Sequence, residues 1–433
     1  MKTLLFIVLD GAADTPNKEL DGKTPYEVAE TPNLDFLARN GKNGIVEILP
    51  IPPESDEAVI ALLGYNVFEV FTGRGPLEAI GGGLNMKDGD LALRCNFATI
   101  EDKKIVNVRA GGIKTEDSEK LERAINRYVS LKDAEFEFKA TEGFRGALVI
   151  RSNKKLSGRI SNTHPGYDLR ILDIFWERDG KIKYVPLSEA VREPLMEIKE
   201  CEPIVKTKSA IRSANLVNEF IEKSRYVLKT HKVNRERVEN GKPPANIILT
   251  RNAGNRVPKL YNLNKAHKLK WACFVDMPVE RGIAHLAGMD VIPIPSPTKD
   301  IENDMKIRVL TLLKNIHHYN AFYVHIKGPD PFGHLGDLKG KIKCLEDIDK
   351  YFFKPLLKDI DLENTIIVVT SDHTTSTEFK VHTEDPVPVI VFGTGKPDNV
   401  ARISEKESKK GRLGKIHSRN LMSYVVNKLK KFD

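Results

Sequence analysis

The segment "GPDPFGH" (328–334) places Asp330 and His334 four residues apart, directly after the apolar run "AFYVHI" (321–326). A carboxylate and an imidazole this close can share one divalent cation. Because glycine and proline are frequent in it, the segment is predicted to be a loop too irregular for rigid helix. Ordinary loop residues would look the same, so other segments must decide whether this pair binds a metal.

Further acids and imidazoles stand at the ends of other short apolar runs: Asp10, Asp372, His373 and His382. Each taken singly has a structural explanation, such as capping a helix or turning a loop. Together with Asp330 and His334 they offer three carboxylates and three imidazoles. Such a set suits two divalent ions sharing one site, as in metal-assisted phosphoryl transfer. Oxygen and nitrogen ligands without thiolate are compatible with Mn²⁺, Zn²⁺ or Mg²⁺.

Ser55 lies in "PPESDEAV", which follows an apolar segment and is predicted to open a helix. An N-cap serine is the ordinary interpretation of this pattern. Among metal ions, however, a serine hydroxyl is acidified by coordination and becomes a nucleophile without a histidine base.

The elements that would position these residues alternate along the chain. The runs 3–10, 271–276, 321–328, 365–373 and 387–393 are short, apolar and rich in β-branched residues, which is typical of buried parallel strands. Helical patterns lie between them, at 31–41, 305–316 and 342–360. This alternation predicts a doubly wound α/β domain, in which ligands bind beyond the carboxyl ends of the strands.

The middle of the chain has a different pattern. The glycine-dense "GRGPLEAIGGG" (73–83) is interpreted as a hinge. Beyond it come strand-like pieces at 90–100, 146–151, 174–185 and 246–251, separated by helical stretches at 117–129 and 210–224. We therefore expect a second α/β domain over 81–261, inserted into a first domain formed by 1–80 and 262–433.

Composition favours an ordered, cytoplasmic protein. The 433 residues are 40% hydrophobic and 30% charged, which suits two globular domains. No run approaches the roughly 18 apolar residues of a membrane span, and the apolar stretch 4–9 is too short for a signal peptide. The four cysteines are far apart with no CxxC pair, which fits a reducing cytoplasm.

The net charge is +8. The densest basic stretches, 229–242 and 406–415, carry almost no aromatic residues for stacking on bases, so solvated surface is the favoured interpretation. We expect neither a nucleic-acid nor a membrane partner. The excess of basic over acidic residues suits a small anionic substrate.

The chain resembles the alkaline phosphatase superfamily and, within it, the cofactor-independent phosphoglycerate mutases in their shorter archaeal form. The resemblance covers nearly the whole chain. It rests on the order and spacing of "VLDGAAD", "LDGKTPYEVAETPNLDFLARNG", "SDEAVIALLGY", "GRGPLEAIGGG", "RCNFAT", "GFRGALVI", "HIKGPDPFGHLGD", "LEDIDKYF", "TSDHTTST" and "HTEDPVPVIVFG".

This resemblance implies a role for each matching residue. One ion would be held by Asp10, Ser55, Asp372 and His373, and the other by Asp330, His334 and His382. Ser55 would be the nucleophile that forms a phosphoserine. The family interconverts 3-phosphoglycerate and 2-phosphoglycerate in glycolysis and gluconeogenesis with two divalent ions, of which Mn²⁺ is favoured here over Zn²⁺ or Mg²⁺, and without 2,3-bisphosphoglycerate.

A strongly anionic substrate calls for arginine, which binds carboxylate and phosphate in a planar, bidentate manner. Arg251 is the first candidate, because it ends the run "NIILT" and resembles the arginine of the family's substrate segment. Arg145, Arg94 and Arg281 are further candidates, for which packing or surface roles are an equal alternative.

Several positions depart from the family pattern. Glu54 stands where glycine usually precedes the nucleophile, and would be strained if that position needs a positive φ. Asn162 and His164 replace two carboxylates of the usual "SDTDP", Asn252 replaces a glycine, and the customary proline after His373 is missing. Since the metal-site residues all match while substrate-side positions drift, two alternatives stay open. One is a metal-dependent phosphatase or phosphotransferase acting on another small phosphorylated substrate. The other, a basic binding protein with a decayed site, is disfavoured by seven intact metal-site residues.

Overall fold

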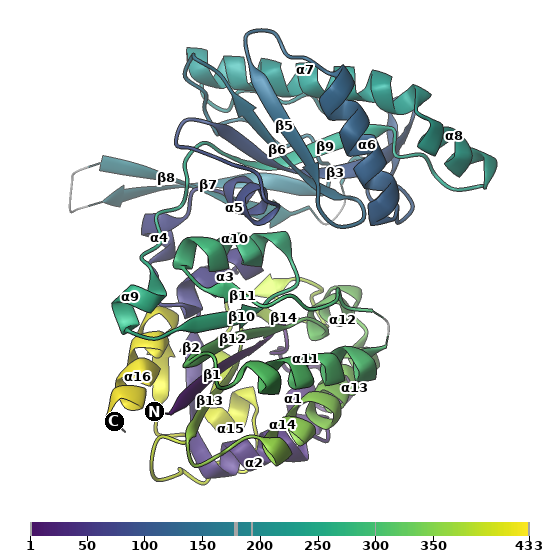
Figure 1. Ribbon diagram of the computed structural model, residues 1–433. Helices are drawn as coiled ribbons and strands as arrows, with labels where there is room; N and C mark the ends of the chain where they lie inside the picture. Colours follow the sequence, from purple (N-terminus) through teal and green to yellow (C-terminus); the bar gives the residue numbers. More distant parts are fainter. Residues whose placement is uncertain (1, 177–180, 192–193, 299, 432–433) are drawn as a thin grey trace. The chain divides into compact units, whose positions relative to one another are not determined.

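A computed structural model describes residues 2–176, 181–191, 194–298 and 300–431 (Figure 1). The chain divides into two compact units. The first unit comprises Met1–Val67, Leu260–Met277 and Ala284–Asp433, and the inserted unit comprises Phe68–Lys259 and Pro278–Ile283.

The first unit is built on a mixed sheet of eight strands. In spatial order they are β11 (Asp290–Val291), β10 (Trp271–Phe274), β12 (Ala321–Ile326), β1 (Thr3–Leu9), β13 (Thr365–Ser371), β16 (Val387–Phe392), β2 (Gly41–Glu47) and β17 (Gly414–His417). All of these except β16 run in the same direction. The predicted α/β class, with its central parallel strands, is therefore confirmed.

Strand β16 corrects the prediction that every apolar run is a parallel strand. It is antiparallel to both β13 and β2. Between Ser371 and Val387 the chain forms only β14 (Thr374–Thr375) and β15 (His382–Thr383), which pair with each other. The chain thus re-enters the sheet at the edge where it left. This reversal keeps His382, before β16, at the edge where the parallel strands end.

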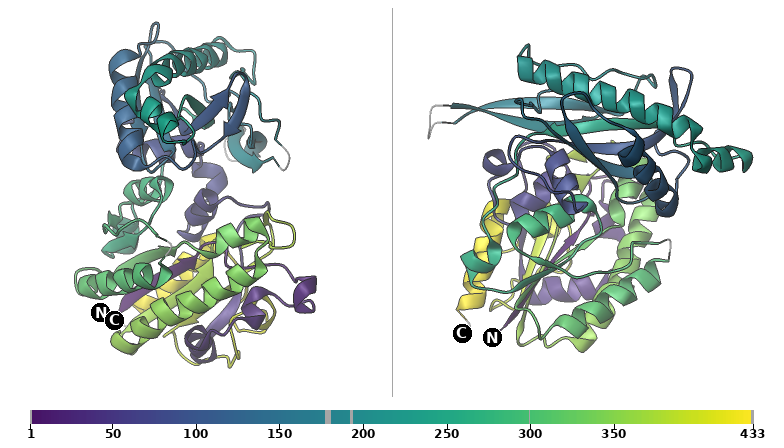
Figure 2. Two further views of the ribbon diagram at one scale, coloured as in Figure 1. Left: turned by 90° about the vertical axis from the view of Figure 1, so that its right-hand side faces the viewer. Right: turned by 45° about the horizontal axis from the view of Figure 1, so that its top comes forward.

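Both faces of the central strands are buried. Leu5, Ile7 and Leu9 of β1 belong to one core cluster, while Leu4 and Phe6, which point to the opposite face, are also fully buried. The covering helices of the first unit include α1 (Pro25–Val28), α2 (Pro32–Asn40), α3 (Ser55–Leu62), α9 (Leu263–His267), α11 (Ile301–Asn315), α13 (Leu338–Ile348), α14 (Lys354–Asp359), α15 (Glu405–Ser408) and α16 (Ser418–Lys430), seen around the sheet in Figures 1 and 2. Burial on both faces explains the continuous apolar runs.

The segment that carries Asp330 and His334 is a short helix, α12 (Pro329–Leu335), so its prediction as a loop is wrong. Gly328, with φ of 155°, precedes the helix, Pro329 occupies its first position, and Gly336 ends it in the left-handed conformation. Proline is tolerated in the first turn, where its missing N–H would have no partner, and glycine suits the end. Gly328, Pro329 and Gly336 therefore mark the ends of the helix, while Pro331 and Gly333 lie within it. Consequently Asp330 and His334 are one turn apart on the same face.

The inserted unit has an antiparallel sheet of five strands, with β9 (Ile247–Gly254), β3 (Leu91–Glu101), β6 (Arg145–Arg151) and β5 (Glu135–Ala140) side by side, and β4 (Lys104–Asn107) also on β3. Its helices include α4 (Val67–Val70), which begins at the last residue of the first unit, α5 (Arg74–Gly81), α6 (Thr115–Tyr128), α7 (Lys208–Thr230) and α8 (Lys232–Glu239), and its hairpin is β7 (Tyr167–Trp176) with β8 (Lys181–Ala190). Helix α10 (Pro278–Ala287) begins in this unit.

The glycine-dense segment 73–83, interpreted as a hinge, forms α5 and the turn that follows it. Gly75 and Gly81 of this segment serve close packing. A Cβ on Gly75 would lie 2.5 Å from the carbonyl oxygen of Ala92, and a Cβ on Gly81 would lie 1.7 Å from that of Pro278. The segment is therefore a tightly packed helix. In the part of the chain that the structure describes, no helix combines the length and apolar character needed to cross a membrane.

Candidate metal centre

Sheet topology brings most of the predicted ligands to one place. Strand β1 lies between β12 and β13, with Leu9 opposite both Ile326 and Ser371. Residues that directly follow these strands are therefore neighbours, although more than 300 positions separate Asp10 from Asp372 in the sequence. The backbone N–H of Gly11 donates to Oδ1 of Asp372 at 2.9 Å and fixes the two loops together.

A first group of side chains surrounds the ring of His373. Its Nε2 atom lies 3.5 Å from Oδ1 of Asp10, 3.4 Å from Oδ2 of Asp372 and 3.3 Å from Oγ of Ser55. Ser55 is the first residue of α3, as predicted. Since β13 and α3 are rigid elements, the serine hydroxyl is held beside the carboxylates.

The carboxylates of this first group fit a cation. Oδ1 of Asp10 and Oδ2 of Asp372 are buried and accept no hydrogen bond. A buried anionic oxygen without a partner is costly, and a metal ion is the usual compensation. Both Asp10 and Asp372 belong to groups whose ligand atoms lie close enough to hold one ion.

The second group consists of Asp330, His334 and His382. Oδ1 of Asp330 lies 3.4 Å from Nε2 of His334 and 3.3 Å from Nε2 of His382, and the two Nε2 atoms are 3.1 Å apart. Nδ1 of His334 lies 3.2 Å from the carbonyl oxygen of Lys380, and Nδ1 of His382 lies 2.8 Å from that of Pro53. Donating Nδ1–H to a carbonyl leaves Nε2 as the ligand atom, which is the arrangement of metal-binding histidines.

Asp330 and His382 of this second group each change the pKa of the other. Burial would lower the pKa of His382, but the hydrogen bond with Asp330 and the charge of Glu54 raise it to about 10. Burial and the Asp10 carboxylate would raise the pKa of Asp330, yet the bond with His382 draws it below its usual range. The site thus has a negative potential that retains a cation, either a proton or a metal ion.

Two residues near the first group escaped the sequence interpretation. His325, within β12, lies 3.5 Å from Oδ2 of Asp372, and Nζ of Lys327 lies 2.8 Å from Oδ2 of Asp10. Burial would raise the pKa of Asp10, but the charge of Lys327 helps to hold it well below its usual value. Both residues lie in the run 321–328. The feature that could have identified them is their position near the end of a strand that pairs with β1.

Three of the four predicted substrate arginines lie together on the inserted unit. In the register of the sheet Arg94 is opposite Arg251, and Asn96 is opposite Arg145. Nε of Arg94 lies 3.2 Å from Oε1 of Glu78, a carboxylate that also pairs with Arg74 at 3.0 Å. Arg281 is on α10, in the part of that helix that belongs to the same unit.

These arginines form a crowded cationic group. Burial, followed by the charges of Arg251 and Arg74, lowers the pKa of Arg94. The Nε atoms of Arg145 and Arg251 are buried without a hydrogen-bond partner. Arg251 also lies over the ring of Tyr167, with Cζ 3.5 Å from the ring centroid. Such donors are suited to a carboxylate or phosphate ligand.

The departures from the family pattern have local explanations. Glu54 has φ of −84°, an ordinary extended conformation, so the expected strain is absent there. Asn252 has φ of 56°, in the left-handed region that asparagine tolerates better than most residues. Its backbone N–H donates to Oδ1 of Asn162 at 2.9 Å.

His164 is buried and uncharged. Its Nδ1 accepts the backbone N–H of Gly166 at 3.1 Å. Burial, followed by the charges of Arg251 and Arg94, lowers its pKa to about 3. A neutral imidazole thus stands beside the arginines where the family pattern has a carboxylate.

Comparisons with known proteins decide the family. A family model described as 2,3-bisphosphoglycerate-independent phosphoglycerate mutase matches residues 38–234. A protein of that name from Methanopyrus kandleri is 37% identical, over 100% of this chain and 98% of the relative. Another from Methanosphaera stadtmanae is 36% identical, over 99% and 98%. The chain belongs to this family.

Solved structures agree with the family assignment. The cofactor-independent phosphoglycerate mutase of Thermoplasma acidophilum is similar with a TM-score of 0.62 and 30% identity, covering 99% of this chain and 100% of that one. A protein of Pyrococcus horikoshii is similar with a TM-score of 0.77 and 27% identity, over 99% and 98%. Membership of the 2,3-bisphosphoglycerate-independent phosphoglycerate mutases makes the protein an enzyme of the isomerase class and supports the use of divalent metal ions.

Proposed function

We propose that the protein interconverts 3-phosphoglycerate and 2-phosphoglycerate through a phosphoserine on Ser55, in glycolysis and gluconeogenesis. The observation that carries the proposal is a serine hydroxyl 3.3 Å from His373, whose ring in turn lies within 3.5 Å of Asp10 and Asp372. Family membership identifies the reaction class.

We assign Asp330, His334 and His382 to one divalent ion, and Asp10, Asp372, His373 and Ser55 to the other. Carboxylate and imidazole ligands without thiolate favour Mn²⁺, with Zn²⁺ or Mg²⁺ as alternatives. When bound, such ions supply Lewis-acid stabilisation of phosphoryl oxygens and acidify a serine hydroxyl. His325 is a further candidate ligand, since its Nε2 is grouped with Asp10 and Asp372.

The chain's own residues then perform the transfer. Oγ of Ser55 gives up its proton and attacks phosphorus, the bond from phosphorus to O3 of the substrate breaks, and that oxygen takes up a proton. The 2-hydroxyl of the retained glycerate next gives up its proton and attacks the phosphoserine, which breaks the bond to Oγ, and Oγ takes up a proton again. Lys327, beside Asp10, offers a cationic donor for the phosphoryl oxygens.

The inserted unit would bind the substrate. We assign this role to the predicted domain 81–261 and the metal chemistry to the predicted domain 1–80 with 262–433. Arg94, Arg145 and Arg251 supply the buried guanidinium donors that a carboxylate requires. Retention of glycerate distinguishes a mutase from a phosphatase. If glycerate leaves, water hydrolyses the phosphoserine instead. We also propose that the enzyme works in the cytoplasm, which suits a chain whose four cysteines are buried and far apart in the sequence.

Product analysis tests the proposal. The protein is incubated with 3-phosphoglycerate and Mn²⁺, and 2-phosphoglycerate and free phosphate are followed by phosphorus NMR. We expect 2-phosphoglycerate to accumulate, Ser55→Ala to abolish turnover with metal content nearly unchanged, and the exposed Ser130→Ala to act as wild type. Free phosphate without 2-phosphoglycerate would identify a phosphatase, and an active Ser55→Ala variant would exclude Ser55 as the nucleophile.

A further inference from the structure

One buried hydroxyl lies between the two groups of the candidate metal centre. Oγ1 of Thr375 is 3.0 Å from Nδ1 of His373 and 2.8 Å from Oδ1 of Asp330. His373 is assigned to one ion and Asp330 to the other. Thr375 is fully buried, and it is not itself an assigned ligand. A single side chain therefore contacts an assigned ligand of each ion.

The chemistry of the three side chains fixes the direction of both hydrogen bonds. A carboxylate oxygen carries no hydrogen, so the Thr375 hydroxyl donates to Asp330. A hydroxyl has a single hydrogen, so the same oxygen can only accept from Nδ1–H of His373. Nε2 of His373 then keeps its lone pair. Since Nε2 is the atom beside Asp10 and Asp372, the hydroxyl selects the tautomer that a metal ligand requires.

The backbone of Thr375 is held by both of its polar groups. Its N–H donates to the carbonyl oxygen of Ala13 at 3.0 Å, and its carbonyl oxygen accepts a bond from Nζ of Lys341 at 2.6 Å. Thr375 also pairs with His382, an assigned ligand, where β14 meets β15. The hydroxyl thus projects from a fixed main chain, which is what a group that orients other side chains needs.

Two glycines make room for this side chain. Gly11 has φ of 57°, and a Cβ on it would lie 2.5 Å from Oγ1 of Thr375 and 2.8 Å from Cβ of Asp330. A Cβ on Gly333, in α12, would lie 2.5 Å from Cγ2 of Thr375. Both glycines are adjacent in sequence to assigned ligands. The hydroxyl and the methyl group of Thr375 are therefore closely packed between the segments that carry these ligands.

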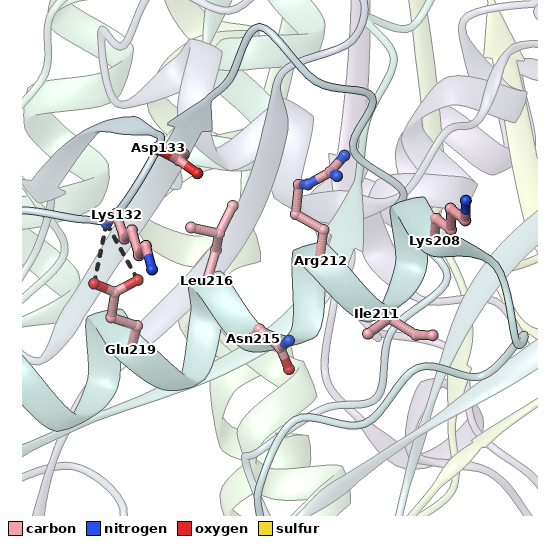
Figure 3. Close-up of a pocket in the computed structure, with 8 residues that line it drawn as sticks. All are labelled: Lys132, Asp133, Lys208, Ile211, Arg212, Asn215, Leu216 and Glu219. Carbon is pink, nitrogen blue, oxygen red and sulfur yellow. Dashed lines mark hydrogen bonds between the residues drawn. The ribbon is translucent and has the colours of Figure 1, made fainter.

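Burial distinguishes these bonds from polar contacts at the surface. In the hollow beside α7 of the inserted unit (Figure 3), the carboxylate of Glu219 accepts the backbone N–H of Lys132 at 3.0 and 3.3 Å and pairs with Lys223 at 2.7 Å. Lys208 and Ile211 in the wall of that hollow are exposed. Contacts open to water contribute little, whereas a buried donor that loses its acceptor is costly. Removing the buried hydroxyl should therefore have a measurable effect.

We propose that Thr375 is a positioning residue for both ions of the candidate metal centre. Its hydroxyl holds His373 in the Nδ1–H tautomer and orients the carboxylate of Asp330. The proposal rests on the assignment of two ions in the proposed function. Hydrogen-bond partners of metal ligands typically contribute ~10- to 100-fold to metal affinity. Because this hydroxyl touches a ligand of each ion, its loss should weaken the binding of both.

Titration of the full chain with Mn²⁺ tests the proposal, with free Mn²⁺ measured by electron paramagnetic resonance. Thr375→Val keeps the shape of the side chain and removes the hydroxyl, so it should weaken both ions at least ~tenfold. Thr375→Ser keeps the hydroxyl and should restore most of that loss. The titration contains no substrate, so a failure of the mutase reaction and a failure of this proposal are separate results.

The neighbouring Thr374→Val is the matched control. Thr374 is also fully buried, but its hydroxyl donates to the carbonyl oxygen of Asp385 at 3.1 Å and not to an assigned ligand. This variant should bind Mn²⁺ as wild type does. The proposal is wrong if folded Thr375→Val binds both ions like Thr374→Val, or if it weakens one ion alone. A wild-type chain that binds fewer than two Mn²⁺ would contradict the assignment of the ions as well.

A spectroscopic measurement separates positioning from a general loss of stability. With ¹⁵N-labelled histidine and saturating Zn²⁺, the wild-type chain should show a downfield Nδ1–H proton of His373 that exchanges slowly with water. In Thr375→Val this resonance should move upfield, and in Thr375→Ser it should stay in place. His373→Gln assigns the resonance by its disappearance. A wild-type His373 without this proton, a result that requires no variant to fold, would overturn the proposal, and so would an unmoved resonance in Thr375→Val.

Discussion

His334 and His382 turn the same ring nitrogen toward each other because a main-chain carbonyl lies beside each Nδ1 atom. In the neutral state both Nε2 atoms are acceptors, and at 3.1 Å they would repel each other and the nearby Asp330 carboxylate. A cation among them removes this conflict. The carbonyl partners would not touch the ion, but they are part of the site, since they fix the ring orientation.

Replacing one of these imidazoles should therefore remove a metal ion. We expect His382→Ala to lose about one equivalent of bound Mn²⁺ and at least ~100-fold in mutase activity. Metal content measured by elemental analysis after gel filtration checks this. His285→Ala, at an exposed histidine of α10, is the control and should keep both properties. Full metal content in His382→Ala would remove His382 from the ligand set.

A second residue-scale feature is the carboxyl group of Glu405, beneath the loop that starts at Asp10. Burial raises its pKa from 4.5 to about 7, although it accepts bonds from the hydroxyl of Thr24 at 2.6 Å and the N–H of Asp14 at 3.0 Å. An acid whose folded pKa is raised binds its proton more tightly in the folded state. Its contribution to stability is thus complete below pH 4.5 and is lost as the pH rises through about 7.

Glu405→Gln should abolish this pH dependence. One pKa unit corresponds to ~1.4 kcal/mol, so Glu405 lowers the free energy of unfolding by up to about 3 kcal/mol between acid and neutral pH. Urea unfolding at a series of pH values, with Mn²⁺ present, should give a flatter profile for Glu405→Gln. The exposed Glu202→Gln should follow wild type. Equal profiles for wild type and Glu405→Gln would contradict the assignment.

At the scale of elements, the features predicted best from the sequence are the strands that a local run of apolar residues identifies. Strands β1, β12 and β13 were recognisable because burial on both faces leaves continuous apolar runs. The residues just after them were therefore recognised as neighbours. The reversal of β16 was missed because its composition equals that of a parallel strand. Its direction follows from the short path between Ser371 and Val387.

The role of a glycine was the hardest to predict from the sequence. In α12 it marks the ends of a helix, and in α5 it permits close approach of other backbone. Composition cannot distinguish these uses from flexibility, because each depends on what lies opposite. His325 and Lys327 were missed for a related reason: both fell in the apolar run, and only the adjacency of β12 and β1 shows that they face Asp10 and Asp372.

If Gly81 serves packing, a methyl group there should be destabilising. Alanine ordinarily stabilises a helix by about 1 kcal/mol relative to glycine. At Gly81, however, the Cβ would lie 1.7 Å from the carbonyl oxygen of Pro278. We expect Gly81→Ala to lower the free energy of unfolding by at least about 2 kcal/mol, measured by urea denaturation.

The neighbouring Gly82→Ala is the matched control. Gly82 has φ of −79°, and its Cβ would come no closer than 3.0 Å to other atoms, one of them a side-chain methyl group of Thr141. A change within about 1 kcal/mol is expected there. Stabilisation by Gly81→Ala would instead favour the original interpretation of a flexible hinge.

At the scale of the whole molecule, the proposed ions and the proposed substrate arginines belong to different compact units. Each unit has its own core: one cluster gathers around Ile7 and Val324, and another around Leu93 and Phe220. A ligand that binds one folded unit stabilises that unit by mass action. Removing the metal ions should therefore destabilise the first unit more than the inserted unit.

Hydrogen exchange before and after chelation measures this inequality. Without metal, Oδ1 of Asp10 and Oδ2 of Asp372 are buried without a hydrogen-bond partner, and Nε2 of His334 lies 3.1 Å from Nε2 of His382, so the loops after β1 and β13 and helix α12 should exchange faster. Strands β3 and β9 of the inserted unit should keep their protection from exchange, since none of the residues assigned to the metal ions lies on them. Adding Mn²⁺ back should restore slow exchange in these loops. Faster exchange spread evenly over both units would mean that the ions support the whole fold, and unchanged exchange in α12 would mean that Asp330 and His334 do not bind one.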